Sequence, residues 1–461
     1  MPERPPQERR MSFDEVGYGY TAEMARGEAE RCLQCKNPVC QQGCPVNIDI
    51  KSFIGAIIEG DLPRGVAVLK ERNALPAVCG RVCPQEEQCE AACVLSKKGD
   101  PVAIGRLERF LGDTDLACEI DGRCVPAVAA PSGLRCAVVG SGPAGLACAG
   151  ELAQLGHEVT IFESLHAPGG VLSYGIPEFR LPKDIVNAEI DMLSEIGVRI
   201  VTNTVVGQLV TVPELLAEEG FDAVFIGSGA GLPVFLGVPG ENLNGVYSAN
   251  EFLTRVNLMR AYEFPTSDTP VWRGRKVAVV GGGNVAMDAA RTAIRLGAED
   301  VFLVYRRTED EMPARREEVH HAREEGVEFK MLCSPVEVVG HDGWVTGITA
   351  TRMELAEPDS SGRRAPVCVL DSEFTIDCDT VISAVGTRAN PLLTKAAPDL
   401  ELSARGYIVT DDDGTTNLPG VYAGGDIVTG AATVILAMGA GKKAAQAMDR
   451  WMRSAGSSAR E

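Results

Sequence analysis

Eight of the fifteen cysteines of this chain lie between residues 32 and 93, in two short runs. The runs read Cys32-x2-Cys35-x4-Cys40-x3-Cys44-Pro45 and Cys79-x3-Cys83-Pro84-x4-Cys89-x3-Cys93. Closely spaced soft thiolates can hold iron–sulfur clusters. The first run resembles the bacterial ferredoxin pattern, except that its middle spacing is x4 instead of x2. Structural zinc is the alternative, but zinc sites usually pair two Cys-x2-Cys hairpins and only one such spacing occurs here. The cysteine runs therefore favour iron–sulfur clusters over zinc.

A glycine-rich turn follows the apolar run at 136–139 and has the spacing Gly140-x-Gly142-x-x-Gly145. Gly140 permits a tight turn, Gly142 lets the backbone approach a pyrophosphate, and Gly145 allows close packing of helix on strand. The next predicted strand ends at Glu163, whose carboxylate can accept hydrogen bonds from a ribose hydroxyl. Strand, loop, helix and acidic residue together predict a dinucleotide site at the helix N-terminus.

A second loop of this kind contains Gly281, Gly283, Asn284 and Ala286 and again follows an apolar run. Its second strand ends in Arg306-Arg307, with no carboxylate at the tip. Arginines at this position can bind a 2′-phosphate through paired hydrogen bonds, which favours NADP over NAD. The alternative is that they are a solvated pair on the surface.

A third motif lies near the end of the chain, where Gly425 and Asp426 follow a predicted strand and a helix rich in small residues begins near Thr433. In flavoproteins, an aspartate at this point contacts the ribitol or pyrophosphate side of the flavin. The positive end of the helix can stabilise reduced flavin. The alternative is a simple left-handed turn and helix cap. Cys136 and Cys148 are expected in the core. His320 and His321 are expected on a solvated helix face.

These motifs need supporting elements of two kinds. Residues 1–130 show short amphipathic stretches separated by Cys and Pro, whereas two strand–loop–helix–strand units follow. We therefore predict an α/β protein with an N-terminal helical iron–sulfur domain and two Rossmann-like nucleotide-binding domains, the FAD domain being interrupted by the NADP domain. The predicted boundaries are 1–130 for two [4Fe-4S] clusters, 131–262 with 380–461 for FAD, and 263–379 for NADP.

The charge balance excludes several partners. With 44 basic and 64 acidic residues, the net charge is −20, which argues against binding nucleic acid or an anionic membrane surface. No uncharged apolar run reaches ~18 residues, so no membrane span is predicted. The polar, Pro-rich start has no secretory h-region, and we expect a cytoplasmic protein.

Taken together, the motifs resemble the small (beta) subunit family of NADPH-dependent glutamate synthase over nearly the whole chain. They are also similar to the N-terminal part of dihydropyrimidine dehydrogenase and to the large subunit of the electron-bifurcating NADH-dependent ferredoxin:NADP oxidoreductase. The resemblance rests on CGRVCP, GSGPAGLACAGELA, GGVLSYGIPEFRLPK, GGGNVAMDAAR, VYRRTEDEMPAR, SAVGTRAN and AGGDIVTGAATVILAMGAGKKAA.

The resemblance implies a ligand set for each cluster. One cluster would be held by Cys32, Cys35, Cys40 and Cys93, and the second by Cys44, Cys83, Cys89 and Glu108. An all-cysteine second cluster that uses Cys79 stays open. The resemblance also places the stretch 169–183 along the flavin, with Gly169, Gly170 and Tyr174 as contacts.

The implied function is electron transfer from NADPH, through FAD and the clusters, to a larger glutamate synthase-type subunit for reductive glutamate synthesis. No catalytic acid or base is implied. The alternative is the bifurcating large subunit, whose partners would be a small flavin/iron–sulfur reductase subunit and ferredoxin. A redox-silent zinc scaffold is a remote third. A homo-oligomer is compatible with each.

Overall fold

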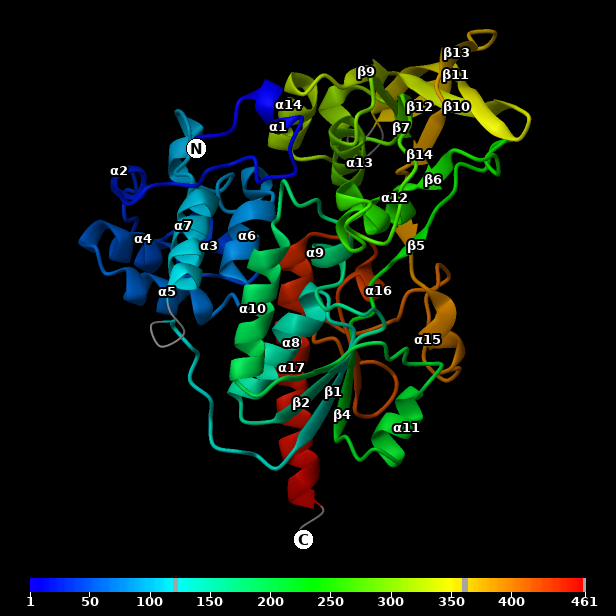
Figure 1. The fold of residues 1–461 in the computed structure, drawn as a ribbon. Coiled ribbons are helices and arrows are strands. Elements are labelled where there is room, and N and C mark those ends of the chain that lie inside the picture. Colours follow the sequence, from blue (N-terminus) through cyan, green and yellow to red (C-terminus); the bar gives the residue numbers. More distant parts are fainter. Residues whose placement is uncertain (119–122, 359–363, 459–461) are drawn as a thin grey trace.

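The computed structural model describes residues 1–118, 123–358 and 364–458. Its N-terminal part is a unit of short helices that lies to one side of two parallel sheets (Figure 1). The helices of this unit are α2 (Ala22–Glu30), α3 (Val39–Gln42), α4 (Ile50–Glu59), α5 (Leu62–Lys70), α6 (Pro76–Val82), η1 (Gln85–Glu87), η2 (Val94–Lys97) and α7 (Ile104–Ala117). The predicted α/β fold class, with a helical part before the two nucleotide-type sheets, is confirmed.

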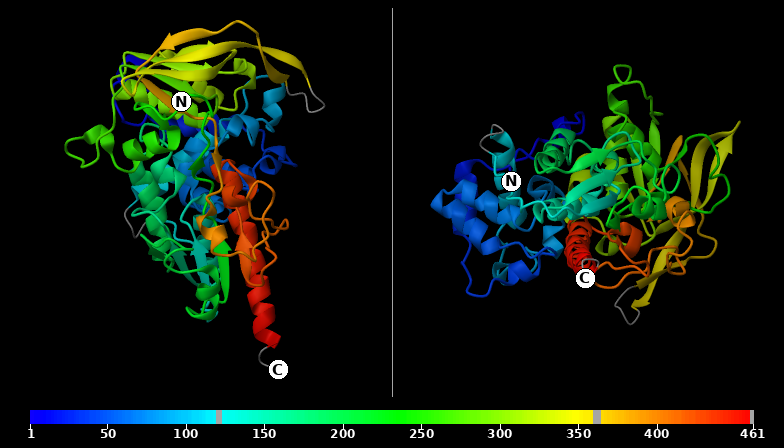
Figure 2. Two further views of the ribbon diagram at one scale, coloured as in Figure 1. Left: turned by 90° about the vertical axis from the view of Figure 1, so that its right-hand side faces the viewer. Right: turned by 90° about the horizontal axis from the view of Figure 1, so that it is seen from below.

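The first sheet has the order β16-β4-β1-β2-β3, and its strands are parallel. Its strands are β1 (Arg135–Val139), β2 (Glu158–Phe162), β3 (Arg199–Val201), β4 (Ala223–Ile226) and β16 (Val421–Ala423). Its helices are α8 (Pro143–Gln154), α9 (Val171–Tyr174), α10 (Lys183–Glu195), α11 (Val212–Ala217), α16 (Asp426–Thr429) and α17 (Val434–Ser458). The long α17 packs along α8, so the C-terminal segment completes the unit that begins at residue 135 (Figures 1 and 2).

The second sheet has the order β6-β14-β7-β8-β9 and is also parallel. Its elements are β6 (Val246–Ser248), α12 (Ala249–Asn257), η4 (Ala261–Glu263), β7 (Lys276–Val280), α13 (Asn284–Arg295), β8 (Asp300–Tyr305), η5 (Glu309–Glu311), α14 (Arg316–Glu324), β9 (Glu328–Met331) and β14 (Thr380–Ser383). An antiparallel sheet projects beyond it, made of β10 (Cys333–His341), β11 (Trp344–Pro358), β12 (Arg364–Cys368) and β13 (Phe374–Asp377) (Figure 2).

The two parallel units are joined by a two-stranded antiparallel pair, β5 (Leu232–Pro233) with β15 (Thr387–Arg388), after which α15 (Pro391–Lys395) leads back to the first sheet. Strands β6 and β14 both pair within the second sheet, although they lie outside the predicted range 263–379. Strand pairing therefore extends the second unit to about residues 246–383. None of the described helices is long and apolar enough to cross a membrane.

Residues 1–17 form a strap between the units, with one short helix, α1 (Pro6–Arg9) (Figure 1). Its anchor is Glu325, which directly follows α14 and is fully buried. The Glu325 carboxylate accepts hydrogen bonds from Arg9 at 3.0 Å, from Arg291 at 2.8 Å and from Arg295 at 2.6 Å. One buried anion thus joins the strap to α13 and α14.

Replacing Glu325 by alanine is expected to destabilise the protein by about 3–5 kcal/mol, because three buried arginines lose a shared counter-charge and only Arg9 and Arg291 keep another carboxylate partner among the described residues. Burial alone would raise the pKa of Glu325, but Arg291 and Arg295 hold it far below its usual range. The folded pKa therefore lies below the unfolded one. The ion pairs contribute fully above about pH 4.3, and their contribution is lost as pH falls below it.

Urea unfolding of wild type and Glu325→Ala at pH 7 and at pH 3 tests this. The gap between the two proteins should narrow at low pH. A matched control is Glu299→Ala, which removes an exposed carboxylate bound to Arg275 and should change the midpoint little. An equal gap at both pH values would contradict the assignment.

Candidate nucleotide and iron–sulfur sites

Cys32, Cys35, Cys40 and Cys93 line one cavity, although they come from three separate segments. The cavity wall is otherwise largely apolar and includes Ile50 and Ile54 of α4. Burial raises the pKa of the Cys32 thiol and that of Cys40, the latter to about 11. Because thiols in this setting ionise only beside a cation, four of them around one cavity fit an iron–sulfur cluster. We refer to this group as the first thiol site.

The second predicted ligand set lies deeper. Cys83, Cys89 and Glu108 are each less than 8% exposed, and Cys44 is half-buried. Burial raises the pKa of Cys44 and of Cys89, and the nearby charge of Glu108 raises both further. Three thiols and one carboxyl group in this buried region are of the chemical types that fit a cluster.

The fourth ligand at this second site is the open question. Glu108 accepts a hydrogen bond from Asn73 Nδ2 at 2.7 Å, and its burial raises its pKa to about 8. Cys79 lies beside Cys83 but packs in the core, with Sγ 3.7 Å from Asn73 Oδ1 and 3.6 Å from Met438 Sδ of α17. Glu108 and Cys79 therefore both contact Asn73. The fourth ligand of the second site stays a prediction.

The first glycine loop follows β1 directly. A side chain at Gly145 would place its Cβ 1.9 Å from the carbonyl oxygen of Gly140, whereas a Cβ at Gly142 would meet no atom within 4 Å. The loop thus packs against its own helix at Gly145 and leaves space at Gly142. This is the cradle that a pyrophosphate requires at the N-terminus of α8.

Glu163 lies at the end of β2 and is 4% exposed. Its carboxylate accepts hydrogen bonds from Ser141 N at 2.9 Å and Ser141 Oγ at 2.5 Å. Ser141 Oγ in turn accepts from Gly169 N at 3.0 Å. Sequence reasoning missed Ser141, and its place inside the glycine loop was the only available signal. It connects the acidic residue, the loop and the stretch that begins at Gly169.

Three further predicted flavin contacts converge on the same space. Gly170 lies so close to the first loop that its Cβ would be 2.8 Å from Gly142 Cα. Burial raises the pKa of Tyr174 to about 12, and the nearby charges of Asp426 and Glu163 raise it further. Residues that follow β2, lie on α9 and begin α16 are therefore close to one another.

Asp426 begins α16, and Gly425 before it has a φ of 77°, a conformation that favours glycine. Burial raises the pKa of Asp426 to about 6, although its Oδ1 accepts a hydrogen bond from Ala432 N at 3.2 Å. Thr433 directly precedes α17. The predicted helix start near Thr433 is confirmed, and the half-buried carboxyl group of Asp426 binds the backbone just before it, at Ala432 N.

The second glycine loop repeats this geometry between β7 and α13. Gly281 has a φ of 147°, and its Cβ would lie 2.4 Å from the carbonyl oxygen of Ala384, while a Cβ at Gly283 would meet Pro313 alone, at 3.9 Å, among the described residues. Ala286 is buried in the core. Asn284 Oδ1 accepts a hydrogen bond from Arg315 N at 2.9 Å, so this side chain connects the loop to the start of α14.

The two predicted phosphate-binding arginines differ in their surroundings. Arg307 is half-buried, and its Nε donates to the carbonyl oxygen of Arg364 at 3.2 Å. Arg306 is exposed and makes no ion pair with any residue that the structure describes. Arg306 is therefore the guanidinium that is free to bind a phosphate.

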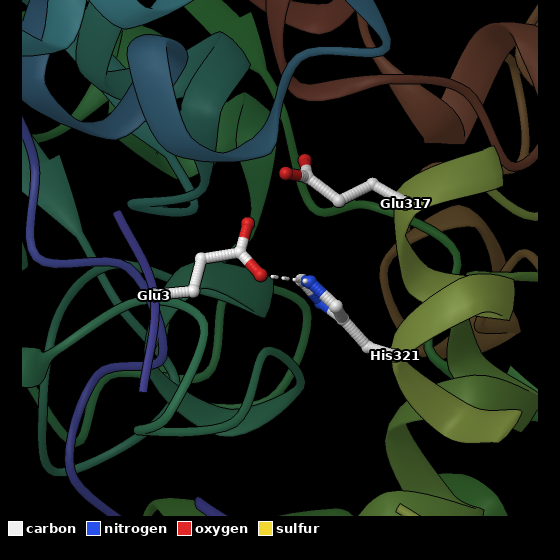
Figure 3. A group of neighbouring side chains, drawn as sticks. All are labelled: Glu3, Glu317 and His321. Atoms are coloured by element: carbon white, nitrogen blue, oxygen red, sulfur yellow. Dashed lines mark hydrogen bonds and ion pairs between the residues drawn. The ribbon is translucent and has the colours of Figure 1, made fainter. Parts of the chain in front are cut away.

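The prediction that both His320 and His321 lie on a solvated helix face is confirmed for His320 and wrong for His321. His320 is exposed, but His321 is 5% exposed and its Nε2 lies 3.0 Å from Glu3 Oε2 (Figure 3). The strap covers it, which the sequence around His321 could not indicate. Glu317 lies beside this pair and binds Arg106 of α7 at 3.0 Å. Because the Glu317 carboxylate is paired with Arg106, we interpret Glu3, Glu317 and His321 as part of an ion-pair network between units and not as a metal site. As expected, Cys136 and Cys148 are buried in the core.

Comparison with known proteins gives consistent matches. Residues 9–120 match the family described as dihydropyrimidine dehydrogenase domain II, 4Fe-4S cluster, and residues 134–446 match pyridine nucleotide-disulphide oxidoreductase. The glutamate synthase [NADPH] small chain of Escherichia coli is 37% identical, over 98% of this chain and 96% of its own length.

Two other similar proteins are longer than this chain. The NADP(+)-dependent formate dehydrogenase subunit beta of Moorella thermoacetica is 41% identical over 90% of this chain and 60% of its own length. The NADPH-Fe(3+) oxidoreductase subunit beta of Geobacter sulfurreducens is 38% identical over 90% and 63%. Among solved structures, Mycobacterium tuberculosis FprA in complex with NADPH covers 71% of this chain and 86% of its own, with a TM-score of 0.59 and 22% identity. That likeness supports the fold.

Proposed function

The chain belongs to the glutamate synthase small-chain group of pyridine nucleotide-disulphide oxidoreductases and is an NADPH-dependent flavin and iron–sulfur enzyme; on this premise, we propose that it supplies electrons for reductive glutamate synthesis on a larger partner subunit. One observation carries the proposal. The likeness to the Escherichia coli small chain covers 96% of that protein, whereas the formate dehydrogenase and Fe(3+) relatives match over less than two thirds of their lengths.

In this proposal, the first glycine loop, Glu163 and Asp426 hold FAD, and the second loop with Arg306 holds NADPH. FAD supplies the chemistry that accepts a hydride and gives up single electrons. The residues of the chain bind and orient the two nucleotides. The N-termini of α8 and α13 bind the phosphates, Glu163 accepts from a ribose hydroxyl, and Arg306 binds the 2′-phosphate.

The two thiol sites would each hold one [4Fe-4S] cluster, with the ligands given above. The first thiol site is half-buried, and the second is more deeply buried, with Cys79 beside it in contact with Met438 of α17. This order fits a path that runs outward from the first sheet unit to the partner. The proposal keeps the three-domain division, with the second nucleotide domain taken as about residues 246–383 because β6 and β14 pair within its sheet.

A bifurcating large subunit remains the second candidate, since the same sites would serve it. It differs in its partners, a small flavin/iron–sulfur reductase subunit and ferredoxin. The 41% identity with a formate dehydrogenase subunit is a reminder that similar chains serve different acceptors.

Anaerobic titration of the purified chain with NADPH, and separately with NADH, tests the electron input. NADPH should bleach the flavin band and part of the broad iron–sulfur band, and equimolar NADH should act far more weakly. Addition of a glutamate synthase large subunit with glutamine and 2-oxoglutarate should then yield glutamate. Glutamate formed by the chain alone, or none formed with the large subunit although the bands bleach, would contradict the partner role.

A further inference from the structure

We propose that the outer edge of the first thiol site is a docking surface for a redox protein with an acidic surface of its own. This rests on the proposed function, because it takes the first thiol site as the point where electrons leave the chain. We call this surface the first-site rim and define it by six residues, namely Leu33, Lys36, Val39, Lys51, Val94 and Lys97.

The apolar part of the rim follows the cysteines closely. Leu33 is 61% exposed, Val39 is 39% exposed and Val94 is 41% exposed. Each is the immediate sequence neighbour of a predicted ligand, Cys32, Cys40 or Cys93. Three large apolar side chains therefore face solvent around one site. Clustered apolar side chains of this kind are typical of the centre of a protein interface.

The charged part of the rim has the opposite sign to the molecule. Lys36 and Lys97 are exposed, and Lys51 lines the cavity mouth. None of the three forms an ion pair within the described part of the chain. Two nearby carboxylates are already engaged, since Asp49 caps α4 and Glu28 binds Arg31. A positive rim on a chain of net charge −20 attracts an acidic partner to this one place.

The rim is also accessible. Five of its six residues are exposed and Lys51 is half-buried. The N-terminal helical unit that carries them lies to one side of both parallel sheets (Figure 1). The second thiol site cannot serve as the contact point, because Cys83, Cys89 and Glu108 are buried. Position, apolar exposure and unpaired lysines therefore indicate one contact surface.

Binding of a purified acidic [2Fe-2S] ferredoxin, used as the probe, tests the proposal by anaerobic calorimetry at low and high salt. The wild-type chain should bind it, and added salt should weaken the binding. The double variant Lys36→Glu/Lys97→Glu should bind at least about 10-fold more weakly. Lys36→Gln/Lys97→Gln should fall between the two.

The matched control is Lys395→Glu/Lys443→Glu, which makes the same change of charge at exposed lysines outside the rim and should bind within about twofold of wild type. Equal losses in both double variants, no binding by wild type at low salt, or tighter binding of a basic cytochrome c would overturn the docking surface.

Iron content and NADPH-dependent ferricyanide reduction are measured on the same samples, because they separate this inference from the proposed function. If the charge-reversed protein holds iron, oxidises NADPH and binds the ferredoxin as tightly as wild type, the docking surface alone is refuted. Protein without iron, or without NADPH oxidation, refutes the proposed function. Leu33→Asn adds a test of the apolar part and should weaken binding without changing its salt dependence.

Discussion

Replacing Cys89 by serine is expected to remove about half of the protein-bound iron, or about four of eight iron atoms per chain. Cys89 is buried with Glu108 and Cys44 nearby, and a hydroxyl is a poor substitute for a thiolate on iron. Iron and sulfide analysis of anaerobically purified protein measures the loss. Cys368→Ser is the control, since this thiol is exposed on β12 and its loss should leave iron unchanged.

Glu108 and Cys79 can be separated by the same assay. If Glu108 is the fourth ligand, Glu108→Ala should lose the second cluster. Cys79→Ala should keep it and lose only the contacts of Sγ with Asn73 and Met438. Glu108→Cys should retain iron but change the low-temperature EPR spectrum of the reduced protein, because a thiolate is softer than a carboxylate. The reverse pattern, with iron lost in Cys79→Ala and kept in Glu108→Ala, would establish the all-cysteine cluster.

The sequence predicted those parts of the sites that are coded locally. Each glycine loop, with its strand, helix and terminal residue, lies within about 30 consecutive residues, so spacing alone indicated its geometry. Gly145 illustrates this, because its close contact with Gly140 follows from the Gly140-x-Gly142-x-x-Gly145 spacing. Glu108 lies outside both cysteine runs, and only the family resemblance pointed to it.

What the sequence could not predict depends on contacts between distant segments. His321 has the pattern of an exposed helix, yet Glu3, more than 300 residues earlier, covers it. The predicted second nucleotide domain left out strands β6 and β14, because the sequence of a strand does not indicate which distant strand it pairs with. Ser141 was missed for a related reason, since its role appears only when Glu163 and Gly169 are brought together.

The choice between NADPH and NADH is expected to depend on Arg306. Replacing it by glutamate should lower kcat/KM for NADPH about 100-fold or more, because a charge-assisted contact worth about 1.5–3 kcal/mol is replaced by repulsion of the 2′-phosphate. The value for NADH, which lacks this phosphate, should change little or rise. Arg306 is exposed and follows β8 directly, so its removal leaves no buried group unpaired.

Arg307 is the internal control for this prediction. Its Nε is already bound to the carbonyl oxygen of Arg364, so Arg307→Ala loses a structural contact and should affect both nucleotides more equally. Steady-state rates with ferricyanide as acceptor measure both ratios without requiring a partner. If Arg307→Ala shifts the NADPH/NADH ratio more than Arg306→Ala does, Arg307 is the phosphate ligand and its side chain must leave Arg364 when the nucleotide binds. If neither does, the two arginines are the solvated pair that the sequence left open, and another group must recognise the 2′-phosphate.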